Sequence, residues 1–164
     1  MNIAGIKNFD VGNGEGVRVS VFVSGCNIHC KGCQNPEAWD FNYGEKLTEK
    51  LKSDIFEKCN NENIAGISIL GGEPLDKNNR EEVLNFIKEY KEKVGKNIWL
   101  WTGYTIPELK AEKDTVSLEI LKLIDVLVEG PYIEEKRDIT LRFRGSTNQR
   151  VLVKDGNKFK IMKE

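Results

Sequence analysis

The sequence predicts an α/β fold in which parallel strands alternate with helices and a short hairpin follows at the C-terminus. Strand-like and helix-like segments alternate at a spacing of roughly 30 residues, which is typical of β-α-β units joined by right-handed crossovers. Each expected strand is followed directly by a Gly-containing segment, and parallel α/β folds build their sites at this end of their strands. At 164 residues the chain is shorter than the roughly 250 residues of a complete eight-fold barrel.

Composition limits the class of protein. Hydrophobic residues make up 39% and charged residues 31% of the chain, as in ordinary globular proteins. The longest apolar runs are far below the ~20 residues that span a bilayer, and the N-terminus does not resemble a signal peptide. We therefore expect residues 1–164 to form a single cytoplasmic domain. Acidic and basic residues are interspersed and the net charge is -1, so we expect no binding to nucleic acid or to a membrane.

The N-terminal part combines an expected loop with the first expected strand. Residues 1–16 are rich in Gly and Asn, and residues 12–16 predict a mobile or tightly turned segment. The β-branched run from Val17 to Val23 predicts a buried strand. This strand places Cys26 just beyond its C-terminal end.

The next unit pairs a helix with a strand that ends in two glycines. The helix is expected at about residues 48–59, and the strand runs from Ile64 to Leu70. Gly71-Gly72-Glu73-Pro74 follows, where the glycines let a ligand approach the backbone and the proline fixes the exit. Asn79 and Glu82 then predict a capping box at the start of the second helix.

The rest of the chain continues the alternation and then becomes irregular. The remaining expected elements are a strand at 98–102, a capping box at Thr105 to Glu108, a helix near 117–124, a strand at 125–128, a polar loop at 142–150 and a hairpin at 151–161 that turns at Asp155-Gly156. Because strands at such spacing pair in parallel, the Gly-containing segments that follow them are expected to meet at one pocket.

Three of the four cysteines lie within eight residues, as Cys26, Cys30 and Cys33. Three thiolates at this spacing predict an inorganic centre. Structural zinc normally takes four protein ligands, often as C-x2-C pairs well apart in the sequence, whereas a 4Fe-4S cluster held by three cysteines leaves one iron open for chemistry. We favour the cluster, and zinc with His29 or Cys59 as its fourth ligand is the alternative.

Cys59 has a simpler interpretation. It recurs at helical spacing with Leu51 and Ile55 on one apolar face, which predicts a buried core thiol. Disulfides are a weaker alternative for the other cysteines, because their spacing is too tight for a useful cross-link.

The cysteine triplet after the first strand, together with Gly71-Gly72-Glu73-Pro74 after the second, resembles the radical S-adenosylmethionine (SAM) enzymes. Further segments narrow the resemblance to the activating proteins of anaerobic ribonucleoside-triphosphate reductases. These segments are Phe22 to Cys26, Gly32 to Asn35, Trp99 to Tyr104, Asp125 to Gly130 and Arg144 to Gln149. The similarity extends through about Val153, and it implies a partial, open (β/α) barrel of the radical SAM type.

The resemblance implies an enzyme whose substrate is another protein. Cys26, Cys30 and Cys33 would hold one 4Fe-4S cluster, whose fourth iron chelates the amino and carboxylate groups of SAM. One electron would then cleave the sulfonium to methionine and a 5'-deoxyadenosyl radical, which takes a hydrogen atom from a glycine of the reductase large subunit. The product would be a glycyl radical.

The resemblance also assigns the SAM contacts. They are Gly32, Cys33, Gln34, Gly71, Gly72 and Glu73, of which the last three would meet the amino group, since glycines expose backbone acceptors. Gly32 stands where many radical SAM enzymes have an aromatic residue, so the residue that packs on adenine is not assigned. Of Trp99 and Trp101, one is expected to face the core and the other the pocket.

The partners follow from the same resemblance. The large subunit of anaerobic ribonucleoside-triphosphate reductase is the expected protein substrate, and a low-potential protein such as flavodoxin is the expected electron donor. The loop from Arg142 to Arg150 is expected at the surface, with Arg144 docking the partner through contacts to a carboxylate. An activator of another glycyl-radical enzyme, of the pyruvate formate-lyase type, and a non-catalytic zinc-binding module are the alternatives.

Overall fold

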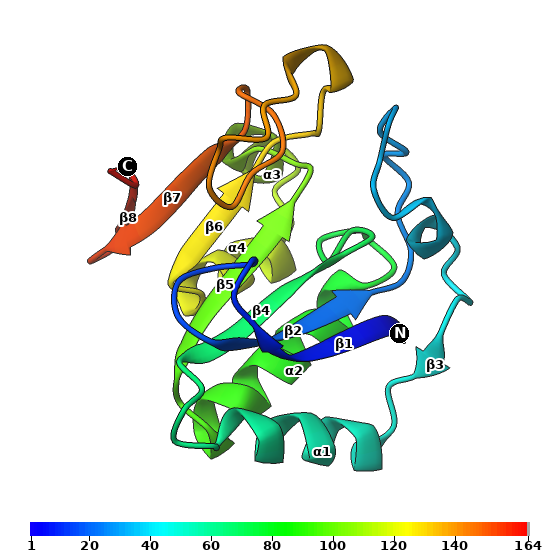
Figure 1. Cartoon of the computed structure of the whole chain (residues 1–164), viewed down its shortest axis with the longest axis vertical. Helices are drawn as coiled ribbons and strands as arrows, with labels where there is room; N and C mark the ends of the chain where they lie inside the picture. The colour runs from blue at the N-terminus through cyan, green and yellow to red at the C-terminus, as the bar shows by residue number, and fades with distance from the viewer. Residues whose placement is uncertain (164) are drawn as a thin grey trace.

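The computed structural model describes residues 1–163, which build one mixed sheet with helices packed against it (Figure 1). Within these residues the sheet has eight strands in the order β3-β1-β2-β4-β5-β6-β7-β8. The strands are β1 (Asn2–Asp10), β2 (Arg18–Val23), β3 (Glu45–Lys46), β4 (Gly66–Gly71), β5 (Asn97–Thr102), β6 (Val126–Glu129), β7 (Arg150–Asp155) and β8 (Lys158–Ile161). The helices are α1 (Glu49–Cys59), α2 (Arg80–Lys93), α3 (Ile106–Ala111) and α4 (Thr115–Leu123), and short 3-10 turns lie at Pro36–Trp39 and Glu134–Lys136.

The centre of the sheet is parallel and its flanks are antiparallel. β2, β4, β5 and β6 pair in parallel, as the alternation of strands and helices predicts. On one flank β1 and β3 run antiparallel, and on the other β7 and β8 form the expected C-terminal hairpin. The sheet is open, since β3 and β8 stand at opposite ends of the strand order. The predictions of an α/β sheet with parallel strands and of a terminal hairpin are confirmed.

The first strand of the chain was not predicted. β1 lies in the Gly- and Asn-rich segment before the expected loop, and it pairs with β2 from Ile3 opposite Val23 to Asp10 opposite Arg18. Its sequence lacks a β-branched run, so pairing between backbones and the burial of Ile3, which is 2% exposed, determine its position. Residues 12–16 form the expected turn.

The apolar core lies between the sheet and the helices. Cys59 of α1 is 0% exposed in this core, which confirms the prediction of a buried thiol. On β5, Ile98 and Leu100 face this core, while Trp99 joins a smaller apolar cluster. Successive side chains of a strand point to opposite faces, so β5 is buried on both of them.

Of the two expected capping boxes, one is confirmed. The Thr105 hydroxyl accepts from the Glu108 N–H and the Glu108 carboxylate accepts from the Thr105 N–H, at the start of α3. The helix expected near residues 117–124 is α4, which is capped by Asp114, whose Oδ1 accepts from the N–H of Val116 at 2.8 Å. A short helix therefore precedes the predicted one.

The capping box expected from Asn79 and Glu82 is wrong. The amide of Asn79 donates to the backbone carbonyls of Ser24 and Glu73, at 3.0 and 3.2 Å, and does not cap α2. Both oxygens of the Glu82 carboxylate accept from the amino group of Met1 at 2.8 Å. Contacts from distant parts of the sequence thus replace the local ones that the spacing predicted.

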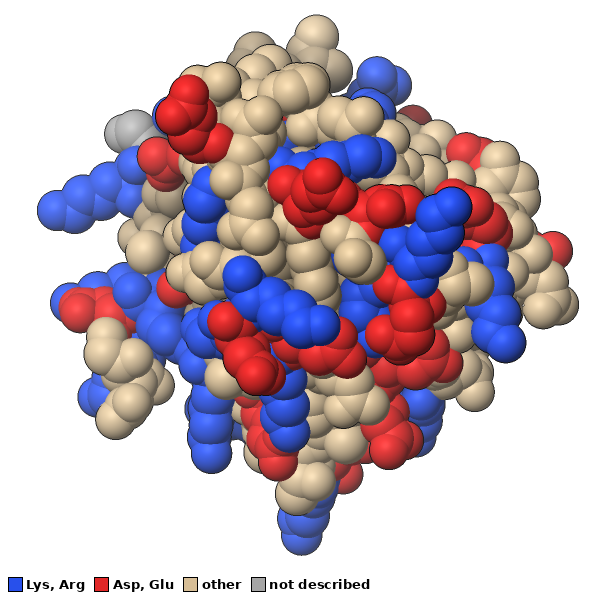
Figure 2. Space-filling model, turned by 90° about the horizontal axis from the view of Figure 1, so that it is seen from below, with Lys and Arg blue, Asp and Glu red and all other residues tan. Residues whose placement is uncertain are grey.

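Charged side chains of both signs alternate over the surface. Figure 2 shows one face of the molecule, on which Lys and Arg are interleaved with Asp and Glu, as the net charge of -1 leads one to expect. Among residues 1–163, none of the helices is both long enough and apolar enough to cross a bilayer.

Candidate functional site

A cavity of about 390 Å³ lies at the carboxyl ends of the parallel strands, a volume that suits a small-molecule ligand. Its wall includes the three clustered cysteines and Gln34 after β2, residues 70–73 at the end of β4, residues 101–103 at the end of β5 and Gly130 after β6. The prediction that the Gly-containing segments meet at one pocket is confirmed. Loops around residues 12 and 143 complete the wall.

The loop that carries the cysteines folds back on the end of β2. The N–H of Cys26 donates to the carbonyl of Trp39 at 3.1 Å, and the N–H of Cys33 donates to the carbonyl of Cys30 at 3.1 Å, which closes a turn. His29 has a φ of 52°, and its ring stacks on Trp39 with the centroids 4.4 Å apart. His29 packs on Trp39 and is not part of the described cavity wall, whereas all three thiols of this loop are.

One of the three cysteine sulfurs accepts a hydrogen bond from a backbone amide, and the other two thiols have a shifted pKa. The Cys33 Sγ accepts from an N–H two residues further along the chain at 3.4 Å. Burial raises the pKa of the Cys26 thiol and of the Cys30 thiol. The amides of residues 28 and 29 oppose this rise in pKa at Cys26, and the amide of Tyr132 opposes it at Cys30. Such donors favour the thiolate, which is the form that binds metal.

The arrangement of the thiols fits an iron-sulfur cluster. Among residues 1–163, no three His, Cys, Asp or Glu side chains converge on the position of one metal ion. In a 4Fe-4S cluster the thiolates bind different iron atoms, so they surround a shared space and do not meet at one point. Cys26, Cys30 and Cys33 line one cavity, and the sulfur of Cys33 accepts a hydrogen bond from a backbone amide.

The two glycines after β4 pack against protein backbone as well as facing the cavity. The N–H of Gly72 donates to the carbonyl of Val23 at 2.7 Å, and the N–H of Glu73 donates to the carbonyl of Gly25 at 2.8 Å. A Cβ at Gly72 would lie 2.7 Å from the carbonyl oxygen of Gly25, and Gly71 has a φ of 115°. The loop after β4 and the cysteine loop are therefore packed backbone to backbone.

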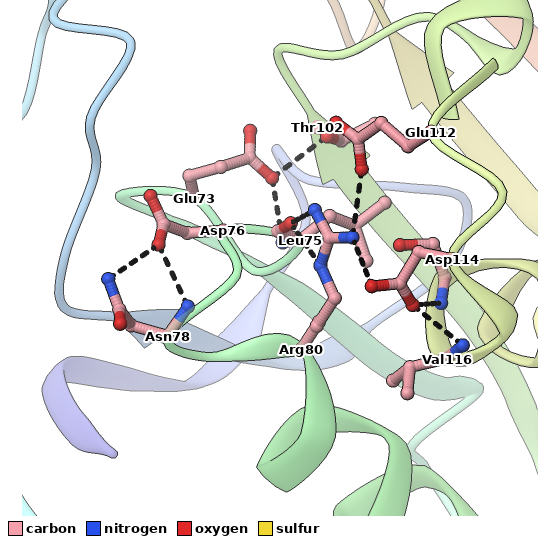
Figure 3. A network of polar contacts seen from close by, with 10 residues as sticks. Glu73, Leu75, Asp76, Asn78, Arg80, Thr102, Glu112, Asp114 and Val116 are labelled. Atoms are coloured by element: carbon pink, nitrogen blue, oxygen red, sulfur yellow. Dashed lines mark hydrogen bonds and ion pairs between the residues drawn. The ribbon is translucent and has the colours of Figure 1, made fainter. Parts of the chain in front are cut away.

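The carboxylate of Glu73 links the loops after β4 and β5 and is 1% exposed (Figure 3). Its Oε1 accepts from the N–H of Gly103 at 2.6 Å. Its Oε2 accepts from the N–H of Leu75 and the hydroxyl of Thr102, at 2.7 and 2.8 Å. Burial raises the pKa of Glu73 to about 7, while these hydrogen bonds act in the opposite direction. They hold the two loops in a fixed position relative to each other.

Arg80, which is 2% exposed, ties the same loop to the connection between α3 and α4 (Figure 3). Its Nε and Nη2 donate to the carbonyl of Leu75 at 3.0 and 2.6 Å. Its Nη1 lies 2.9 Å from an oxygen of Glu112 and 3.0 Å from an oxygen of Asp114. The sequence pattern did not single out Arg80, although a charged residue soon after Gly-Gly-Glu-Pro, at the start of a helix, was an available signal.

Asp76 is a second residue that sequence reasoning missed. Its Oδ2 accepts from the side-chain amide of Asn27, in the cysteine loop, at 2.9 Å. Its Oδ1 accepts from the N–H of Asn78 at 3.0 Å. Asp76 thus joins the cysteine loop to the loop after β4 through side chains, beside the backbone contacts of the glycines.

The two tryptophans of β5 lie at different depths on one face of the sheet. Trp99 is 2% exposed within the smaller apolar cluster, and Trp101 lines the cavity. Their ring centroids are 5.7 Å apart, and Trp101 Nε1 donates to the carbonyl of Phe143 at 2.8 Å. The expectation that one faces the core and the other the pocket is confirmed.

Comparisons with known proteins agree with this geometry. Residues 12–152 match a protein family described as a 4Fe-4S single cluster domain. The chain is 41% identical, over 91% of its own length and 95% of the relative, to the anaerobic ribonucleoside-triphosphate reductase-activating protein of Pasteurella multocida (strain Pm70). The protein of the same name from Escherichia coli (strain K12) is 39% identical over 85% of this chain and 90% of the relative, and that of Enterobacteria phage T4 is 37% identical over 92% and 93%.

The chain belongs to this family of activating proteins. The resemblance drawn from its motifs is therefore confirmed. The zinc-binding module is not favoured, since the matching family is described by a 4Fe-4S cluster.

The expected SAM contacts do not all lie on the cavity of this family member. Gln34 and residues 71–73 line it, together with Cys33. Gly32 is exposed and outside the described wall, and a side chain there would overlap the carboxylate of Glu134. Its contact with the cofactor stays a prediction.

The loop from Arg142 to Arg150 has a different environment from the one expected. Arg144 and Gln149 line the cavity, and the Nη1 of Arg144 donates to the carbonyls of Thr147 and Gln149, at 3.2 and 2.8 Å. Arg142 is exposed, as predicted for a surface loop, while Arg144 is half-buried within the loop's own fold. Docking of the reductase by Arg144 stays a prediction.

Proposed function

We propose that this protein is a radical SAM activase, which cleaves SAM reductively and generates a glycyl radical on the large subunit of anaerobic ribonucleoside-triphosphate reductase. One observation carries the proposal: three cysteines and the Gly-Gly-Glu segment line one cavity in a chain of this family. An activator of the pyruvate formate-lyase type is not favoured, because the curated relatives are named for the reductase.

The residues of the cavity have distinct roles in this proposal. Cys26, Cys30 and Cys33 hold one 4Fe-4S cluster, and Gln34 with the loop of residues 71–73 binds SAM beside it. When bound, the cluster supplies one electron to the sulfonium of SAM, which yields methionine and a 5'-deoxyadenosyl radical that takes hydrogen from a glycine of the reductase. The carboxylate of Glu73 keeps the SAM-binding loop in register with the loop after β5.

The wider setting belongs to the same proposal. The open sheet is a partial barrel of the radical SAM type, supported by four parallel strands whose carboxyl ends face one cavity. Residues 1–164 act as one domain. The four cysteines are free thiols, which fits a reducing compartment such as the cytoplasm, where a low-potential protein such as flavodoxin supplies the electron.

Iron and acid-labile sulfide analysis of anaerobically purified protein tests the metal centre. We expect four of each in the wild type, and their loss in Cys26→Ser, Cys30→Ser and Cys33→Ser. Cys59→Ser is the matched control, because its thiol lies in the core on α1 and should leave the iron content unchanged. Equal loss of iron in Cys59→Ser and Cys26→Ser would contradict this assignment of ligands.

The reaction is tested in two steps with the same protein. Dithionite and SAM alone should give methionine and 5'-deoxyadenosine, detected by chromatography. Addition of the reductase large subunit should give a glycyl radical signal in EPR spectra. A protein that holds iron and cleaves SAM but forms no radical on this subunit would keep the radical SAM chemistry and overturn the choice of partner.

A further inference from the structure

Strand β8 forms a free edge of the sheet, because it stands last in the strand order and pairs only with β7 among the described residues (Figure 1). The opposite edge, β3, has two residues and offers little backbone to a partner. The N–H of Met162, directly after β8, donates to the carbonyl of Val151 at 2.8 Å. Since backbone groups alternate in direction along an antiparallel strand, those of Phe159 and Ile161 point away from β7. β8 thus presents backbone donors and acceptors to which a further strand can bind.

The hairpin of β7 and β8 carries a local excess of positive charge. Residues 150–163 contain five basic residues and one acidic residue, in a chain whose net charge is -1. Arg150 is engaged by the carboxylate of Glu129, and Lys154 donates to the carbonyl of Leu121. The other three basic side chains are exposed and lie in or directly after β8, and they are Lys158, Lys160 and Lys163.

The protein itself does little to neutralise these three lysines. Lys160 pairs with Asp155, but the two side chains are 71% and 61% exposed, so the pair contributes little. Lys158 and Lys163 form no ion pair with any other described residue. The free edge of the sheet is therefore positive and attracts a partner of negative charge.

A second copy of the protein is a poor occupant of this edge. Two paired copies of β8 would bring the lysines of one copy close to those of the other, and like charges across a sheet are destabilising. Nucleic acid and anionic membranes would use the charge but neither the free backbone groups nor Ile161, which is 67% exposed. An extended peptide segment with acidic side chains uses all three features.

The free edge stands beside the cavity without covering it. Gln149 lines the cavity and β7 begins at the next residue, while none of residues 150–163 belongs to the described wall. Ile161 lies opposite Leu152, so the end of β8 returns toward the start of β7 and the cavity. A partner segment bound at β8 is therefore anchored near the cavity and leaves it open to another segment of the same partner.

We propose that β8 is a docking edge for the protein substrate, to which an extended, acidic segment of the reductase large subunit adds as a further strand. This inference rests on the proposed function, because it takes the reductase as the partner. The backbone of β8 supplies hydrogen bonds and its lysines supply charge complementarity. Docking at this edge raises the effective concentration of the target glycine at the cavity.

The first test measures the Kd of cluster-loaded protein for the reductase large subunit, at low and at high salt. The edge variant, Lys158→Glu with Lys160→Glu, reverses the charge of β8. The helix variant, Lys50→Glu with Lys122→Glu, is the matched control, because it makes the same change in net charge at exposed positions of α1 and α4. We expect about a tenfold increase in Kd for the edge variant at low salt, a smaller one at high salt, and less than about a twofold increase for the helix variant. Cleavage of SAM with dithionite alone should match the wild type in both variants.

A second pair of variants tests the addition of a strand. Ile161→Pro removes an N–H that points away from β7, and proline is tolerated on edge strands. Ile161→Ala shortens the same side chain and keeps the N–H. We expect the Kd of Ile161→Pro to be about five times that of Ile161→Ala, as the loss of one hydrogen bond predicts.

Equal Kd values for the edge and helix variants would overturn the inference, and so would equal values for the two Ile161 variants. Loss of SAM cleavage in the edge variant with a protein electron donor, at an unchanged radical yield with dithionite, would assign the edge to the donor. Dimers of the wild type that the edge variant abolishes would assign it to a second copy, and binding of a DNA oligonucleotide or of anionic vesicles that the edge variant abolishes would assign it to those ligands. A wild type that neither binds the large subunit nor forms a radical on it would instead contradict the proposed function.

Discussion

Two segments that wall the cavity are held by different chemistry. The loop of residues 71–76 is fixed by the hydrogen-bonded carboxyl group of Glu73 and by the ion-paired guanidinium of Arg80, which are 1% and 2% exposed. Residues 130–132, which follow β6, are fixed by the neutral, half-buried amides of Asn148 and Gln149, which donate to the carbonyls of Pro131 and Gly130. Removing one partner of a buried charge pair costs about 3–5 kcal/mol, whereas a neutral hydrogen bond contributes about 1 kcal/mol. The molecule therefore has a rigid side of the cavity and a side that mutations can adjust at small cost.

The largest effect is expected from Arg80→Met. This change leaves the carbonyl of Leu75 without its donors and two carboxylates without their cation, so the free energy of unfolding should fall by about 3 kcal/mol. Urea denaturation measures it. Lys88→Met is the control, because its pair with Glu119 is about half exposed and should contribute less than about 1 kcal/mol. Equal effects of the two changes would remove the basis for calling this side rigid.

A pair of glycine substitutions compares the two sides directly. Gly72→Ala places a Cβ against the backbone of Gly25, so we expect a loss of about 2 kcal/mol in unfolding free energy and a lower iron content. In Gly145→Ala the new Cβ would lie 3.1 Å from the ring of Tyr132, which can shift. The free energy of unfolding should therefore fall by less than about 1 kcal/mol.

Gly5→Ala is the control for both glycine substitutions, since nothing lies within 4 Å of a Cβ built there. Its stability should match the wild type in the same urea denaturation. A loss of unfolding free energy in Gly145→Ala as large as that in Gly72→Ala would mean that the side of the cavity at residues 130–132 is as rigid as the side at residues 71–76.

Glu73→Gln should change the pH dependence of stability. The pKa of Glu73 is raised from 4.5 to about 7, so between these values the folded protein keeps a proton that the unfolded chain has released. The contribution of Glu73 to the free energy of unfolding is therefore largest below pH 4.5. It falls as the pH rises toward 7, by up to about 1.4 kcal/mol per pH unit. Urea denaturation at pH 5 and about pH 8 should show a smaller fall in the variant. Parallel pH profiles would show that Glu73 is ionised throughout.

A smaller effect than that of Arg80→Met is expected from Arg144→Ala. Its guanidinium donates to two carbonyls of its own loop, and their loss should lower the unfolding free energy by about 1 kcal/mol. Because Arg144 lines the cavity, SAM cleavage with dithionite and glycyl radical yield should fall together. Arg142→Ala, at an exposed position, is the control. Intact cleavage with a reduced radical yield would instead support docking of the reductase by Arg144.

The parallel strands and the cysteine triplet could be predicted because their signals are local. A β-branched run such as Val17 to Val23 has few alternatives to a buried strand, and three cysteines in eight residues already share a loop. β1 was not predicted because its side chains show no β-branched run and no regular alternation, and its pairing with β2 through backbone groups leaves no pattern in the sequence. A strand with an apolar alternation would have been found.

The polar residues around the cavity could not be predicted, since their partners are distant in the sequence. Arg80 meets Glu112, which is 32 positions away, and Asn79 meets the carbonyl of Ser24, which is 55 positions away. Local spacing led instead to a capping box for Asn79, because the same side chain can cap a helix or bond a neighbouring loop. Only the packed fold decides between these two uses.

The order of strands in the sheet has a consequence for the time course of folding. The β7–β8 hairpin is local and can close in roughly 1–10 μs, whereas β2 meets β4 only after the long segment with the cysteines has been looped out. The wall of the cavity combines segments at the carboxyl ends of β2, β4, β5 and β6. The cavity is therefore complete only after all four parallel strands have paired, so that a ligand of this cavity can stabilise the protein only late in folding.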